Sequence, residues 1–92
     1  MNSIRIRISG RVQHVGFRAC TRKIAVNLRL GGSVRNLDDG AVEILATGDM
    51  AVLEKFIGML YGCPRAVIRD IEVKEIPLLH QDGFFVLRNT IQ

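Results

Sequence analysis

The feature that most constrains the fold is a strict alternation of apolar and polar residues over positions 3–9. Ile4, Ile6 and Ile8 alternate with arginine and serine. Successive side chains of a β-strand point to opposite faces of its sheet, so this period of two predicts a strand with one buried and one solvated face. We take residues 3–9 as the most clearly defined strand of the chain.

Apolar periodicity predicts six further elements. In chain order these are a helix over 18–28, strands over 33–38 and 41–47, a helix over 50–61, and strands over 65–76 and 84–88. Gly31-Gly32 is expected to break the first helix, and Asp49 to cap the second. Asp39-Gly40 is a typical hairpin turn. We expect a bulge or bend near Arg69-Asp70.

This order is β-α-β-β-α-β followed by a terminal strand. It predicts a ferredoxin-like α+β sandwich, with an antiparallel sheet, both helices on one face and a short terminal strand. A chain of 92 residues can bury one core, so we expect a single domain over residues 1–92. The apolar stripes of the two helices predict these core positions: Thr21, Ile24, Ala25, Leu28, Met50, Leu53, Phe56, Ile57 and Leu60. The strand over 65–76 is predicted from its apolar residues Val67, Ile71, Val73 and Ile76.

Residues 10–18 lie between the first strand and the first helix and form a candidate anion site. The segment contains two glycines, two arginines and no acidic residue. A helix N-terminus exposes unpaired N–H groups and the positive end of the helix dipole. Arg18 adds a planar guanidinium suited to two phosphate oxygens. The predicted topology also brings Asn36, in the later half of the second strand, to the same end of the sheet.

Composition argues against several other functions. The net charge of +4 favours anionic ligands, but the basic residues are dispersed, and one tyrosine and no tryptophan offer few stacking platforms for nucleic acid. Arg5 and Arg7 stand where an RNA-binding sheet would carry aromatic residues. Residues 1–7 carry charges unlike a signal peptide, and no apolar run approaches the length of a membrane span. We therefore expect a cytoplasmic protein that binds neither nucleic acid nor membrane.

Two segments resemble the signatures of the acylphosphatase family. Residues 10–18, GRVQHVGFR, resemble the first signature, G-x-V-Q-G-V-x-F-R. Residues 34–43, VRNLDDGAVE, resemble the second, V-x-N-x-x-D-G-x-V-E. Residues 62–66, GCPRA, are similar to the family's G-P-x-x-A segment, although the match is imperfect. The order and spacing of these segments agree with the family across essentially the whole chain.

The resemblance implies an enzyme that hydrolyses acyl phosphates to a carboxylate and inorganic phosphate without metal or cofactor. It implies that Arg18 and Asn36 are the catalytic residues, with Asn36 orienting the attacking water. We expect a monomer, with inorganic phosphate as product and inhibitor. The resemblance assigns binding of the substrate phosphate to the loop residues Gln13, His14, Val15, Gly16, Phe17 and Arg18.

The residue types agree with this chemistry. The leaving carboxylate has a conjugate acid of pKa about 4–5, judged from side-chain carboxyls, so it departs without a proton donor. A loose phosphoryl-transfer transition state asks little of a base, so positioning and charge stabilisation can carry the rate. The sequence contains no convincing acid/base pair or metal cluster, which fits this scheme.

His14 departs from the signature, which has glycine at this position. If the loop needs a positive φ there, a side chain costs about 1–2 kcal/mol. Three alternatives are open: the loop tolerates His14 and activity persists, protonated His14 adds a phosphate contact that fades above about pH 6.5, or the loop is distorted. The last would give a weak or inactive module that binds phosphate or acyl phosphate.

Two further departures from the family are expected to affect only stability or the surface. Arg29 stands where the family has a helix-ending glycine, and Ser33 replaces an aromatic residue.

The two cysteines, Cys20 and Cys63, do not match a zinc or C-x-x-C motif. The predicted topology puts both at the same end of the sheet, so a disulfide is geometrically conceivable. We expect two reduced thiols unless their Cα atoms lie within about 7 Å.

Overall fold

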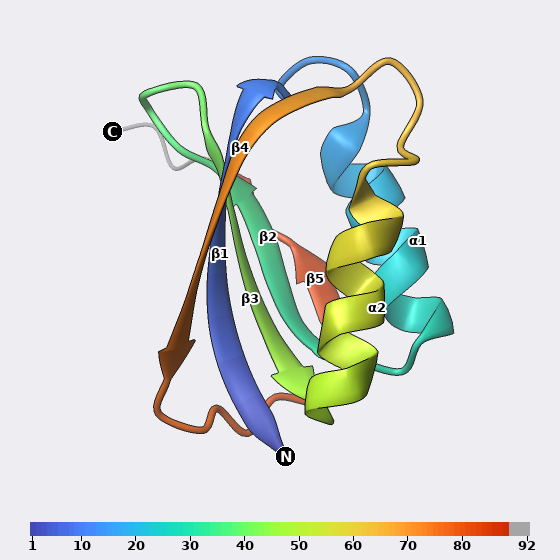
Figure 1. Cartoon of the computed structure of the whole chain (residues 1–92), viewed down its shortest axis with the longest axis vertical. Coiled ribbons are helices and arrows are strands. Elements are labelled where there is room, and N and C mark those ends of the chain that lie inside the picture. Colours follow the sequence, from blue (N-terminus) through green and yellow to red (C-terminus); the bar gives the residue numbers. More distant parts are fainter. Residues whose placement is uncertain (89–92) are drawn as a thin grey trace.

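The computed structural model describes residues 1–88, and this part of the chain folds into two helices and five strands (Figure 1). The elements follow the predicted order. Their bounds are β1 (Asn2–Arg11), α1 (Phe17–Asn27), β2 (Gly31–Asn36), β3 (Val42–Gly48), α2 (Met50–Leu60), β4 (Val67–Ile76) and β5 (Phe84–Val86).

The strands form one sheet in the order β4-β1-β3-β2-β5. The first four are antiparallel to their neighbours, whereas β5 pairs with β2 in parallel. Both helices cover the same face of the sheet (Figure 1). The predicted ferredoxin-like α+β fold is therefore confirmed, with the terminal strand extending it into a mixed sheet.

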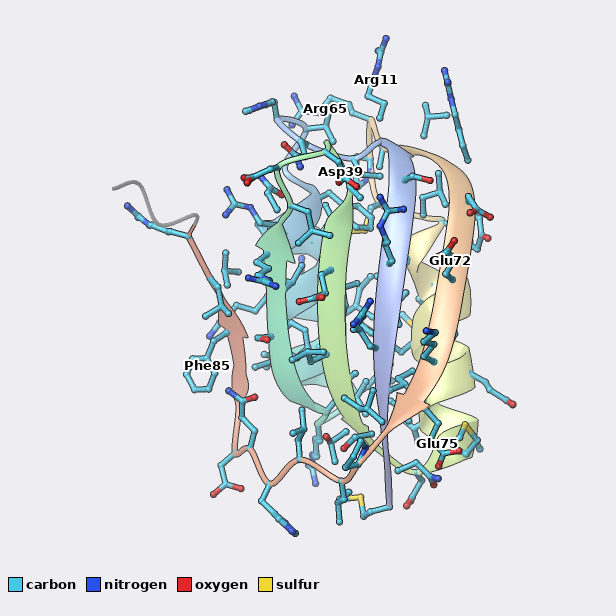
Figure 2. The ribbon with its side chains drawn as sticks, turned by 90° about the vertical axis from the view of Figure 1, so that its left-hand side faces the viewer. Arg11, Asp39, Arg65, Glu72, Glu75 and Phe85 are labelled. Atoms are coloured by element: carbon cyan, nitrogen blue, oxygen red, sulfur yellow. A yellow bond between two sulfur atoms is a disulfide. The ribbon has the colours of Figure 1, made fainter. Side chains whose placement is uncertain are left out.

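The open face of the sheet carries charged side chains (Figure 2). Arg5 and Arg35 both pair with Glu43, at 3.6 Å and 2.9 Å, and Arg7 pairs with Asp39. The two bridges to Glu43 join neighbouring strands, and the third joins β1 to the turn between β2 and β3. All three pair arginines that would otherwise be free to bind an anionic ligand. Exposed ion pairs contribute little stability, typically about 0–1 kcal/mol each.

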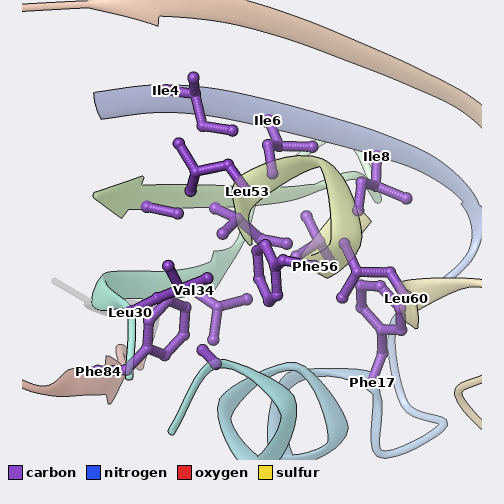
Figure 3. Close-up of a cluster of buried hydrophobic side chains, with 14 of the residues drawn as sticks. Ile4, Ile6, Ile8, Phe17, Leu30, Val34, Leu53, Phe56, Leu60 and Phe84 are labelled. Atoms are coloured by element: carbon purple, nitrogen blue, oxygen red, sulfur yellow. The ribbon is translucent and has the colours of Figure 1, made fainter. Parts of the chain in front are cut away.

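The helix-covered face carries the core (Figure 3). Ile4, Ile6 and Ile8 are at most 2% exposed, which confirms the buried face predicted from the alternation. Phe56 of α2 meets Phe84 of β5 in an edge-on contact, with ring centroids 6.3 Å apart. Burying a side chain of this size is worth about 1.5–3 kcal/mol, so this core is the main stabilising contribution to the fold.

One predicted core residue, Met50, and two apolar residues of the 65–76 strand lie at the surface. Met50, Val67 and Val73 are 39%, 51% and 47% exposed. Met50 is the first residue of α2, and the two valines belong to β4, an edge strand. Their positions satisfy the apolar period, but the helices do not cover them. On β4, Ile68 and Ile71 pack against the core.

A bulge interrupts the pairing of β1 with β4, as predicted. Ser9 pairs with Asp70 and Gly10 with Ile68, so Arg69 is the extra residue. The irregularity lies where β1 approaches the 10–18 loop. Bulges increase local twist and redirect a strand end, and here the redirected end leads into that loop.

The end of α1 corrects one prediction. Gly31-Gly32 does not break the helix, because both glycines lie within β2. Gly32 adopts φ 146°, and a Cβ there would collide with the Leu45 carbonyl of β3, so the strand needs glycine for close backbone approach. The helix ends earlier in a Schellman motif: Leu30 N–H donates to the Ala25 carbonyl at 2.9 Å, and Arg29 N–H to that of Val26 at 3.0 Å.

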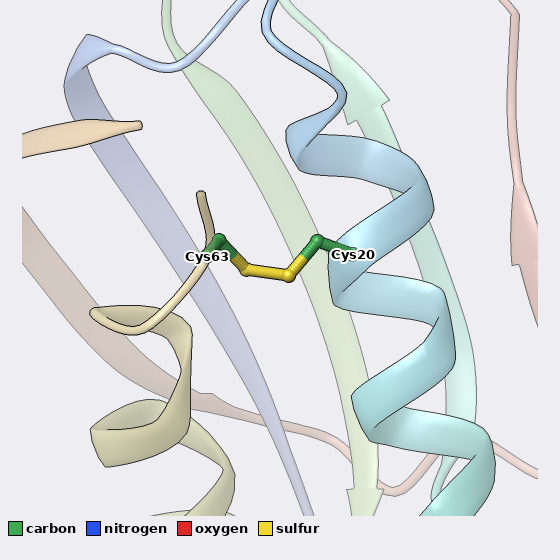
Figure 4. Close-up of a disulfide and its surroundings, with 2 residues drawn as sticks. All are labelled: Cys20 and Cys63. Carbon is green, nitrogen blue, oxygen red and sulfur yellow. A yellow bond between two sulfur atoms is a disulfide. The ribbon is translucent and has the colours of Figure 1, made fainter. Parts of the chain in front are cut away.

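Cys20 and Cys63 form a disulfide, so the expectation of two reduced thiols is wrong (Figure 4). Their Cα atoms are 6.0 Å apart, inside the range a disulfide requires. The bond joins the second turn of α1 to the segment that follows α2. It fixes this segment beside the start of α1.

Replacement of Arg29 by glycine should stabilise the protein. Arg29 closes the Schellman motif with φ 59°, a left-handed conformation that costs a non-glycine residue about 1–2 kcal/mol, partly offset by the greater freedom of glycine in the unfolded chain. Urea denaturation should show Arg29→Gly gaining about 0.5–1 kcal/mol in free energy of unfolding. Arg29→Ala keeps the Cβ and should gain nothing; equal gains in both variants would contradict this account.

Candidate active site

A cavity of about 230 Å³ lies at the end of the sheet where β1 leads into α1. The predicted convergence is confirmed, since the 10–18 loop, the first turn of α1 and Asn36 at the end of β2 share this cavity. Val86 of β5 adds a wall that the sequence did not indicate. The lining residues are Val12, His14, Gly16, Phe17, Arg18, Ala19, Asn36 and Val86.

The loop turns through two left-handed residues before the helix begins. His14 has φ 63°, and Gly16, the N-cap of α1, has φ 77°. His14 therefore occupies the left-handed conformation that its glycine counterpart in the signature would adopt freely. Histidine is among the residues found there more often than most, and its side chain is exposed. The loop accommodates His14 without a break in its path.

The residues that line the cavity from this loop have unpaired backbone donors. Within residues 1–88, no backbone carbonyl accepts a hydrogen bond from the N–H groups of residues 14–19. The first turn of α1 contains no acidic residue, and no side chain caps it. The positive end of the helix dipole is thus left available to an anion.

Arg18 lies at the second position of α1 and is partly buried. Its Nη1 donates to the Leu87 carbonyl at 3.0 Å, just beyond β5. Arg22, one turn later, donates from Nε to the Phe84 carbonyl at 3.1 Å. A guanidinium carries five N–H donors, so Arg18 is held against the β5 segment and retains donors for a ligand in the cavity.

Asn36 lines the cavity and carries an unpaired side-chain acceptor. Its Oδ1 is buried and has no hydrogen-bond partner within the described chain. An unsatisfied buried acceptor costs about 1–3 kcal/mol, and a bound hydrogen-bond donor that reached it would recover part of that cost.

Gln13 and Val15 belong to the loop, but neither side chain lines the cavity. The Nε2 of Gln13 donates to the carbonyls of Leu37 and Ala41, both at 2.8 Å. Val15 packs against the core. Gln13 therefore ties the loop to the turn between β2 and β3, directly after Asn36.

Asp39 stabilises that same turn. Its Oδ1 accepts from Ala41 N–H at 3.0 Å, and its Oδ2 accepts from Arg7. The hydrogen bond from the Ala41 amide and the one from Arg7 lower the pKa of the Asp39 carboxyl below its ordinary value. The turn is held from the loop side by Gln13 and from the sheet side by Arg7.

Residues 1–88 contain no cluster of three or more His, Cys, Asp or Glu side chains that could hold a metal ion. No helix in this part of the chain is long and apolar enough to cross a membrane.

Comparison with known proteins gives one family. The family model for acylphosphatase matches residues 4–86. An acylphosphatase of Archaeoglobus fulgidus is 41% identical over 94% of this chain and 98% of its own length, and one of Solibacter usitatus is 45% identical over 84% and 81%. The crystal structure of the Bacillus subtilis acylphosphatase superposes with a TM-score of 0.90 at 38% identity, covering 95% of this chain and 99% of that one.

The match extends over both signature segments and the whole β-α-β-β-α-β unit. Sequence, fold and cavity thus agree, and the chain belongs to the acylphosphatase family.

Proposed function

We propose that the 10–18 loop, Arg18 and Asn36 form the site at which this acylphosphatase hydrolyses acyl phosphates to a carboxylate and inorganic phosphate. One observation carries the assignment: Asn36, whose side-chain Oδ1 has no hydrogen-bond partner in the described chain, lines the same cavity as Arg18 and loop residues with unpaired amides. The site thus offers hydrogen-bond donors for an anion and a hydrogen-bond acceptor for a neutral donor such as water.

The donors bind the phosphoryl group. The N–H groups of the loop and the free N–H groups of the Arg18 guanidinium converge on its oxygens, and the α1 dipole adds positive potential. These donors are already in place before substrate arrives, so they stabilise transition-state charge with little reorganisation. Gln13, Val15 and Phe17 contribute through their backbone, while the side chains of Gln13 and Val15 shape the loop.

The acceptor orients water. Asn36 Oδ1 accepts a hydrogen bond from the attacking water and so directs a lone pair of the water oxygen toward phosphorus. The P–O bond to the acyl group breaks, and the electron pair leaves with the carboxylate, which needs no proton. No strong base is required, because the transition state is loose and bond formation to water is late.

The left-handed conformation of His14 supports the reading in which the loop tolerates this residue and activity persists. An inactive binding module would need a distorted loop, whereas His14 here adopts the left-handed conformation expected of the glycine in the signature. We further propose that the protein acts as a monomer and as one domain over residues 1–92, in the cytoplasm, with inorganic phosphate as product and competitive inhibitor.

Replacement of Arg18 and replacement of Asn36 should change different kinetic parameters. Arg18→Ala removes phosphate binding and transition-state charge stabilisation, so kcat/KM for benzoyl phosphate should fall at least about 100-fold and inhibition by phosphate should weaken. Asn36→Ala removes only the water contact, so kcat should fall about 100-fold while phosphate inhibition stays nearly unchanged.

Lys23→Ala is the matched control, since it removes one positive charge from the exposed side of α1. It should leave kcat/KM for benzoyl phosphate and the inhibition by phosphate within about twofold of wild type. Wild-type kcat in Asn36→Ala, or loss of activity in Lys23→Ala equal to that in Arg18→Ala, would contradict the proposed site.

His14→Gly distinguishes the alternatives for this residue. Relief of the left-handed strain should raise the free energy of unfolding by up to about 1 kcal/mol, with kcat/KM within about threefold of wild type at pH 5.5 and 7.5. If protonated His14 contacted phosphate, wild-type activity would decline between these pH values and the variant would not. If His14 blocked the site, activity would appear only in the variant.

A further inference from the structure

A second guanidinium lies beside the phosphate loop, outside the cavity. Arg65 belongs to the connection between α2 and β4, and its side chain is exposed. Its Nη2 is 3.7 Å from the point where Gly16 would carry a Cβ. Arg65 is not among the cavity-lining residues, but Gly16, which its guanidinium approaches, is one of them.

The structure holds Arg65 in this place. Cys63, two residues earlier, is bonded to Cys20 of α1, which fixes the connection against the helix that begins at the loop. Arg65 itself adopts φ 66°, a strained conformation for a residue with a side chain. Strain of this kind persists where surrounding structure imposes it, and a backbone that is already fixed has less freedom to lose when a ligand binds.

The charge of Arg65 is uncompensated. Within residues 1–88 it forms no ion pair, whereas Arg5, Arg7 and Arg35 on the open sheet face all do. Figure 2 shows Arg65, Arg11 and Asp39 at the same end of the molecule, and the Asp39 carboxylate is already bound to Arg7. An exposed cation without an acidic partner is available to an anionic ligand.

The direction of the reaction places the acyl group near Arg65. In-line displacement puts the attacking water and the leaving group on opposite sides of phosphorus. Asn36 ends β2, and in Figure 1 the connection between α2 and β4 lies on the far side of the first turn of α1 from the end of β2. With water at Asn36, the acyl group extends toward Gly16 and Arg65. This step rests on the proposed function.

We propose that Arg65 is a specificity-determining residue that binds a second anionic group on the acyl half of the substrate. The guanidinium fork matches a carboxylate or phosphate a few atoms from the bond that breaks. The site then prefers acyl phosphates whose acyl group carries a negative charge of its own over acyl phosphates with an apolar acyl group of the same length.

Succinyl phosphate and butyryl phosphate provide the test, because they have the same chain length and differ in a terminal carboxylate against a methyl group. Wild type should prefer succinyl phosphate, with a preference that declines as salt rises. Arg65→Ala should lower kcat/KM for succinyl phosphate about fivefold and change that for butyryl phosphate less than twofold. Arg65→Lys should retain part of the preference.

Lys55→Ala, on the exposed side of α2, removes the same charge and should change kcat/KM for neither substrate. If Arg65→Ala does not fold, Arg65→Gly, which relieves the left-handed strain, replaces it. An equal decline for both substrates, or no decline for succinyl phosphate, overturns the role of Arg65. Failure of the proposed function has a different signature, namely hydrolysis of butyryl phosphate that survives Arg18→Ala.

Discussion

Burial of one face of β1 is the interaction on which the rest of this structure depends. Ile4, Ile6 and Ile8 are almost fully buried in a strand that has neighbours on both sides, β3 and β4. Both helices pack over this face, and that arrangement fixes where the chain must leave the sheet to start α1. The 10–18 loop is this exit, and its position therefore follows from the core.

The proposed active site is built from groups that the scaffold leaves unsatisfied. The Oδ1 of Asn36 and the N–H groups of residues 14–19 have no backbone or side-chain partner that would compete with substrate in the described chain, and His14 holds a left-handed turn. Each of these features costs stability. The neighbouring contacts are fully made: Gln13 donates twice to the β2–β3 turn, and Asp39 joins that turn to Arg7. Rigid surroundings thus keep a few polar groups free and in position.

The sequence predicted the element order, the hairpin, the bulge at Arg69 and the meeting of the loop with Asn36, because each follows from local periodicity or from topology. It did not predict the wall formed by β5, a strand of three residues whose place depends on parallel pairing with β2 and on side-chain hydrogen bonds from Arg18 and Arg22, all distant in sequence. Gly32 was misread because a glycine that ends a helix and one that permits close strand contact look alike. The disulfide depends on a Cα separation that spacing along the chain does not determine.

The most direct test of this account is a titration of the isotope-labelled protein with inorganic phosphate, followed by NMR of the backbone amides and arginine side chains. We predict saturable shifts that are largest for the N–H groups of residues 14–19 and for the Arg18 guanidinium. Shifts concentrated instead on Arg5, Arg7 or Arg35 of the open sheet face, with the loop amides unchanged, would contradict the central claim that this loop holds the phosphoryl group.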